Sequence, residues 1–165
     1  MTFILRWPAI LAELALAFLS FAGALAAAGA ITGYNTGIAQ VQQAQVAANQ
    51  AGAGAASWID VGLWAGAGLF FLISSIRLMR RTQAFWTWLL GFALYGGRWA
   101  YSQRAGLEDT IRGIDINAYR NPQAVIADLG SPTAQVGLLA VVLLVGLIVF
   151  IVDAADRAHW DRQGA

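Results

Sequence analysis

Four long apolar segments make up most of this chain of 165 residues. A helix that crosses a hydrocarbon core of roughly 30 Å needs about 20 mostly apolar residues. The segments at residues 7–31, 58–79, 85–101 and 133–152 come close to or exceed that length. Because only 12% of the residues are charged and the mean hydropathy is +0.61, too little polar surface remains to cover a water-soluble domain. We therefore expect an all-α integral membrane protein with four transmembrane helices.

The arginine residues predict how these helices are oriented. The end of the second segment and the short turn after it carry three of them, whereas the loop at about 34–56 has no charge and acidic residues outnumber basic ones in the loop at about 102–131. Positively charged flanks favour the cytoplasmic side. Both termini and the short turn should therefore be cytoplasmic in a bacterial inner membrane, with the two longer loops outside. The arginines that carry this prediction are Arg6, Arg77, Arg80, Arg81, Arg157 and Arg162.

Local capping signals mark where the helices should begin. Ser57 and Asp60 have the spacing of a capping box, in which the serine side chain and the acidic side chain each satisfy a backbone N–H group. Pro8 and the Ser131-Pro132 pair suit the first turn of the first and fourth helices. Thr82 is expected to cap the third helix, which would make residues 58–101 a tight antiparallel hairpin.

The two outer loops should be partly helical. The first is rich in Ala and Gln, which favour helix, so the first helix is expected to continue to about Gln50. A flexible low-complexity linker is the alternative. In the second loop, residues 121–130 have the cap and terminator of a short helix, and Val125, Ile126 and Leu129 would share one face.

Ionisable residues within the apolar segments are candidates for structural or functional roles, because burying a charge in a membrane is costly. Glu13 and Arg77 have similar predicted depths near the cytoplasmic side and should form an ion pair. Asp60 and Arg98 should likewise meet near the outer side of the hairpin. For Arg98 the alternative is binding of an anionic lipid or another anionic ligand, because Gly96 and Gly97 leave room beside its guanidinium.

Glycines at intervals of four residues predict close helix packing. Such spacing places a smooth groove on one face of a helix, where another backbone can approach. The groove would be filled by a neighbouring helix of the same chain or, for the first helix, by another subunit. The predicted packing glycines are Gly29, Gly33 and Gly37 on the first helix and Gly62 and Gly66 on the second.

Several classes of function lack their sequence signature. The chain has no cysteine and one histidine, His159 in the charged C-terminal tail, so we expect no metal site and no haem or pigment ligand within the membrane. No nucleotide-binding or catalytic motif is present. The net charge of +1 does not indicate the basic surface that nucleic-acid binding requires. We expect no enzymatic activity and no cofactor, with bound lipids as the candidate ligands.

The central hairpin resembles small bacterial four-span membrane proteins of an uncharacterised family. The resemblance rests on Asp60-Val61-Gly62-Leu63, on the Gly66-Ala67-Gly68-Leu69-Phe70-Phe71-Leu72 run, and on Gly96-Gly97-Arg98. It implies a four-span fold and no particular activity.

These patterns lead to one preferred function and two alternatives. The preferred hypothesis is a non-catalytic accessory or structural subunit that packs against a larger integral membrane complex or against copies of itself. The first alternative is a small oligomeric transporter or channel that uses Arg98 to select its solute. The second is a membrane assembly factor or sensor that binds a partner through its outer loops.

Overall fold

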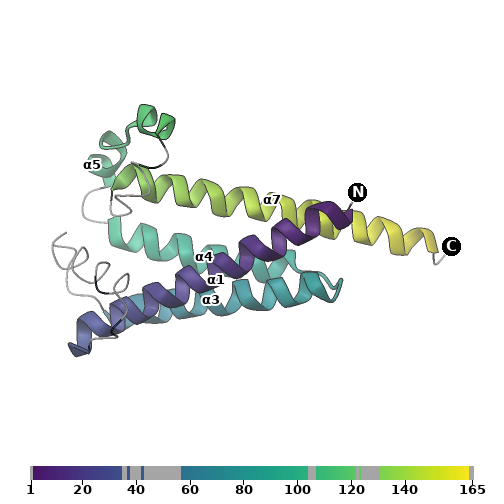
Figure 1. Cartoon of the computed structure of the whole chain (residues 1–165), viewed down its shortest axis with the longest axis horizontal. Coiled ribbons are helices and arrows are strands. Elements are labelled where there is room, and N and C mark those ends of the chain that lie inside the picture. The colour runs from purple at the N-terminus through teal and green to yellow at the C-terminus, as the bar shows by residue number, and fades with distance from the viewer. Residues whose placement is uncertain are drawn as a thin grey trace.

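The computed structural model describes residues 2–34, 37, 42, 57–103, 107–121, 123 and 131–163. Within these residues every regular element is a helix, as predicted (Figure 1). Four long helices form the body of the protein, and two short ones precede the last. The elements are α1 (Thr2–Thr32), α3 (Trp58–Met79), α4 (Phe85–Gln103), α5 (Leu107–Arg112), the 3₁₀ helix η1 (Ile116–Arg120) and α7 (Pro132–Gln163).

Three of the long helices have the length and apolar character needed to cross a membrane. The qualifying stretches are Ile4–Thr32, Trp58–Met79 and Thr133–Ala158. The 19 residues of α4 would extend over roughly 28 Å at 1.5 Å per residue, but they include Arg98 and several glycines and aromatic residues with polar edges. The protein is therefore a membrane protein with three clear candidate spans, and a fourth span through α4 stays a prediction.

The helix starts follow their local signals in two places. Ser57 forms the capping box at α3, because its Oγ accepts from Asp60 N at 3.3 Å while its own N–H donates to Asp60 Oδ2 at 3.2 Å. At α7, Ser131 Oγ accepts from Ala134 N at 3.2 Å. This last helix does not end near residue 152 but continues to Gln163, eleven residues further.

Three expectations about helix ends were wrong. Pro8 lies inside α1, which begins at Thr2, rather than at its first position. Thr82 does not cap α4; its backbone N–H and its Oγ both donate to Arg77 O, at 2.9 and 3.2 Å, and so close the end of α3. The first helix does not continue to about Gln50, as expected, but ends at Thr32. Gly33 has a φ of +69°, in the left-handed region where glycine commonly terminates helices.

Both outer-loop predictions are tested only in part. The second loop is partly helical, since it contains α5 and η1, and Tyr119 Oη ties η1 to α7 by donating to Thr133 O at 2.6 Å. The expected helix at residues 121–130 lies almost entirely outside the described residues.

The four long helices pack in a ring. Helix α1 packs mainly on α3 and α3 on α4, while α7 closes the ring through smaller contacts with α1 and α4. In Figure 1, α1 crosses the bundle obliquely: its N-terminal end lies beside α7 and its C-terminal end beside α3. The buried core between them contains Phe71, Trp88, Val145 and Val149.

Aromatic rings seated on glycines join α1 to α3, α3 to α4 and α4 to α7. A Cβ added at Gly23 would lie 2.8 Å from the Trp64 ring, and one added at Gly68 would lie 3.1 Å from Phe21, so α1 and α3 exchange rings reciprocally. Absence of a side chain at these positions lets the ring contact the helix backbone. The same arrangement joins α3 to α4 through Phe71 on Gly91, α4 to α7 through Trp88 on Gly146, and η1 to α7 through Tyr119 on Gly137.

Candidate functional site

Polar side chains gather at two places in the bundle. The turn-end cluster lies where α1, α7 and the turn between α3 and α4 meet, and consists of Arg6, Glu13, Ser74, Asp153 and Asp156. The Arg98 cluster lies at the opposite end of the hairpin. It consists of Asp60, Trp64, Tyr95 and Arg98.

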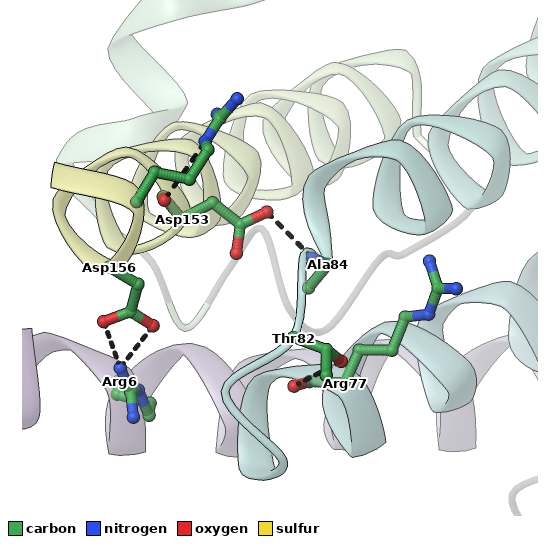
Figure 2. Close-up of polar contacts among 7 residues, drawn as sticks. Arg6, Arg77, Thr82, Ala84, Asp153 and Asp156 are labelled. Carbon is green, nitrogen blue, oxygen red and sulfur yellow. Dashed lines mark hydrogen bonds and ion pairs between the residues drawn. The ribbon is translucent and has the colours of Figure 1, made fainter. Parts of the chain in front are cut away.

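An ion pair in the turn-end cluster connects the first helix to the last. Arg6 Nη2 donates to both carboxylate oxygens of Asp156 at 2.6 Å (Figure 2). The side chains are 9% and 20% exposed, so water screens this pair less than a surface pair. It therefore fixes the N-terminal end of α1 against α7.

Asp153 supplies the N-terminal cap of α4 from a different helix. Its Oδ2 accepts from Ala84 N at 2.8 Å (Figure 2). The same oxygen accepts from Phe85 N at 2.7 Å, and the residue is buried. These backbone N–H groups have no partner within their own helix, and the positive end of the helix dipole favours a carboxylate there. Asp153 thus joins α7 to the hairpin by two hydrogen bonds.

Glu13 meets Ser74 rather than Arg77. Ser74 Oγ lies 2.6 Å from Glu13 Oε1, and Glu13 is fully buried. Arg77 is exposed, its Nη1 donates to Gln83 O at 3.2 Å, and its side chain points away from Arg6 in Figure 2. The predicted Glu13–Arg77 ion pair is therefore wrong. Because Arg77 lies at the end of α3, its guanidinium can reach a backbone carbonyl at the surface, and this avoids the cost of burying its charge.

The Arg98 cluster brings together the other predicted pair. Arg98 Nε lies 3.7 Å from Asp60 Oδ1, an ion pair longer than a hydrogen bond. The guanidinium carbon lies 4.8 Å from the centroid of the Trp64 ring, in cation–π geometry, and Trp64 packs edge-on against Tyr95. Since Asp60 also holds the capping box, this cluster couples the start of α3 to the last turns of α4.

The glycines predicted to line packing grooves have different roles. Gly29 is buried in α1, whereas Gly33 and Gly37 both have left-handed backbone conformations beyond its end and so do not continue a helical stripe. Gly66 faces Leu94 of α4, with an added Cβ only 2.9 Å from that side chain. Around Gly62, no described atom lies within 4 Å of an added Cβ.

Sequence reasoning missed Asp153, Asp156 and Ser74. The two aspartates were assigned to a cytoplasmic tail because the fourth apolar segment ends near Val152. Their spacing of three residues on a continuing helix, together with Arg157, was the available signal, since such residues share one face. Nothing in the sequence indicated that Ser74 contacts another helix, because a serine in a transmembrane helix usually hydrogen-bonds to the backbone of its own helix.

The clusters do not form a metal site in the part of the chain that is described. There, no group of three or more His, Cys, Asp or Glu side chains is arranged to hold a metal ion. What both clusters can do chemically is to join helices through buried charge and hydrogen bonds.

No protein-family model, curated protein sequence or solved structure matches the chain. The resemblance of the central hairpin to four-span bacterial proteins stays a prediction. Function must be argued from the geometry alone.

Proposed function

We propose that the protein is a non-catalytic structural subunit of a larger integral membrane complex, which it contacts through the outer end of the α3–α4 hairpin. One observation carries this proposal. At Gly62, Gly96 and Gly97 no described atom lies within 4 Å of an added Cβ. The Asp60–Arg98 contact places these three glycines, here called the open-glycine surface, at the same end of the hairpin.

The open-glycine surface contrasts with the interfaces inside the bundle. There, Gly23, Gly68, Gly91 and Gly146 each receive an aromatic ring from the neighbouring helix. On the open-glycine surface, no aromatic ring of the described residues covers the glycines. In lipid, burial of apolar surface contributes little to helix association, so association depends on close van der Waals packing. Small residues permit that packing because they let a second helix approach closely.

Exposed aromatic and aliphatic side chains border this surface. Trp58 and Ile59, in the first turn of α3, are 64% and 57% exposed. A partner helix seated on the open-glycine surface would cover them as well. The paired charges of Asp60 and Arg98 beside it would help to fix the depth of the partner.

Replacing Gly62 by Leu should therefore weaken association without unfolding the protein. Leucine fills the open-glycine surface, and since it meets no described atom of its own bundle, the fold should tolerate it. We expect affinity for the partner to fall about tenfold or more, which corresponds to about 1.4 kcal/mol. The measurement is the mass of the protein purified in mild detergent from the membranes of its native host.

Ala140→Leu is the matched control, because Ala140 is exposed on α7, a helix that carries none of the three glycines of the open-glycine surface. It should leave the assembly intact. A wild-type protein that runs as a monomer without associated proteins would contradict the proposal, as would equal effects of the two leucines.

We further propose that α4 crosses the membrane, giving four spans with both termini in the cytoplasm of a bacterial cell. Arg77, Arg80 and Arg81 border the α3–α4 turn, and they support its cytoplasmic placement. Because α4 packs lengthwise against α3 and also contacts α7, it shares the depth of two candidate spans.

Single cysteines test this topology, since the natural chain has none. Cysteines replace Thr82 in the turn and Ile116 in η1, both of which are exposed. A membrane-impermeant maleimide added to spheroplasts should label position 116 and should reach position 82 only after permeabilisation. Labelling of both positions from the same side would show that α4 does not cross.

A further inference from the structure

The carboxyl group of Glu13 is buried, and no basic side chain among the described residues forms an ion pair with it. Its Oε1 contacts Ser74 Oγ, while Oε2 has no hydrogen-bond partner among the described residues. An ionised carboxylate in such a place would lose its hydration and gain one hydrogen bond. Proteins normally avoid that cost by pairing the charge or by keeping the group neutral.

The charged groups around Glu13 do not pair with it. Arg6, on the same helix, is held by Asp156, and Arg77 on α3 is held by the Gln83 carbonyl. Arg157 on α7 donates to the backbone carbonyl of Asp153, and Arg98 on α4 lies in the opposite cluster. Asp153, in the same cluster, is itself an acidic residue and so offers no opposite charge to Glu13.

The contacts of Ser74 are compatible with a neutral Glu13. A serine hydroxyl carries one hydrogen, yet Ser74 Oγ lies 2.6 Å from Glu13 Oε1 and 3.2 Å from Ala84 O. Beside an ionised Glu13 that one hydrogen would have to be shared between the two acceptors, whereas a protonated Glu13 makes each contact a separate hydrogen bond. The carboxylic acid then donates to Ser74 Oγ, and Ser74 donates to the Ala84 carbonyl.

We infer that Glu13 is a proton-binding site, and that its bound proton holds α1 against the α3–α4 turn. The chain of donors runs from α1 through Ser74 of α3 to Ala84 in the turn. Loss of the proton would leave a buried negative charge beside Asp153 and reverse the direction in which Ser74 donates. The closed packing at this end should then open as the pH rises. This inference stands independently of any partner at the open-glycine surface.

The two glutamates of the chain make a direct test feasible. The other one, Glu108, has a side chain that is 88% exposed. Protein labelled with ¹³C at the glutamate carboxyl carbon should give two NMR signals in nanodiscs, and the Glu108→Gln variant should give Glu13 alone. We expect the Glu13 signal at the position of a protonated acid at neutral pH. An ionised Glu13 at neutral pH in this folded protein would overturn the inference.

Helix separation provides the second readout. Spin labels on cysteines replacing Leu11 of α1 and Ile76 of α3, both exposed positions, report the distance between these helices. The distance should increase when the pH exceeds that at which the Glu13 signal titrates, and it should stay constant in Glu13→Gln, which cannot ionise. A distance that does not respond in the wild type, or that responds equally in Glu13→Gln, would refute the link between proton and packing. If Glu13→Gln does not fold, the NMR titration of the Glu108→Gln protein decides on its own.

Discussion

Gly146→Ala should destabilise the protein by about 1–3 kcal/mol or more, because the six-membered ring of Trp88 occupies the space of the missing side chain. The added methyl group would overlap the ring atoms directly. Trp88 is buried and stacks on Phe85 and Phe92, so the indole has little freedom to move aside. The contact between α4 and α7 should therefore loosen. The measurement is reversible unfolding in detergent or bicelles, with helix content as the signal.

A second substitution separates overlap from other effects of the mutation. Trp88→Leu removes the overlapping ring atoms, so the double variant should lose less stability than the sum of the two single variants. Gly97→Ala, on α4 itself, is the matched control, since nothing described lies near its added Cβ. It should be close to neutral. Equal destabilisation by Gly97→Ala and Gly146→Ala would show that the Trp88 contact is not responsible.

Asp153→Ala should destabilise the protein by about 2–5 kcal/mol. It leaves the N–H groups of Ala84 and Phe85 buried without a partner, and each unsatisfied donor costs about 1–3 kcal/mol. Asp153→Asn keeps an acceptor oxygen but loses the charge that the helix dipole favours, so its cost should be smaller. Amide hydrogen exchange gives a local readout, in which the protons of residues 84 and 85 should exchange faster in both variants.

The control for this prediction is an acidic residue outside any buried network. Glu108→Gln removes a charge that lies 3.9 Å from Arg112 in an exposed pair, and such pairs contribute little. It should change neither the stability nor the exchange at residues 84 and 85. Unchanged exchange at these two residues in Asp153→Ala would contradict the proposed cap.

Features that depend on local sequence were predictable. The bounds of α3 and its capping box follow from Ser57 and Asp60, since residues three apart at a helix start contact each other whatever the rest of the fold does. The Asp60–Arg98 contact followed from the antiparallel hairpin, which sets equal depths for the two residues.

Features that depend on helix rotation and on distant partners were not predictable. Depth alone placed Glu13 near Arg77, but the rotation of α3 about its axis presents Ser74 instead. The glycine spacing of α1 was read as a stripe, yet the chain leaves the helix after Thr32. The cap of α4 comes from Asp153, 68 and 69 residues away, and no local pattern indicates an acceptor at that separation.

That long separation also sets an order for biosynthesis. The ribosome completes α3, the turn and α4 long before it reaches Asp153. The N–H groups of Ala84 and Phe85 therefore lack their acceptor until α7 has been made. Arg6 likewise waits for Asp156, which is made 150 residues later. Chains interrupted before α7 is complete would therefore expose unsatisfied groups on both α1 and α4. The nascent protein can reach its mature packing only after synthesis has passed Asp156, and quality-control proteases would meet the hairpin before then in an unfinished state.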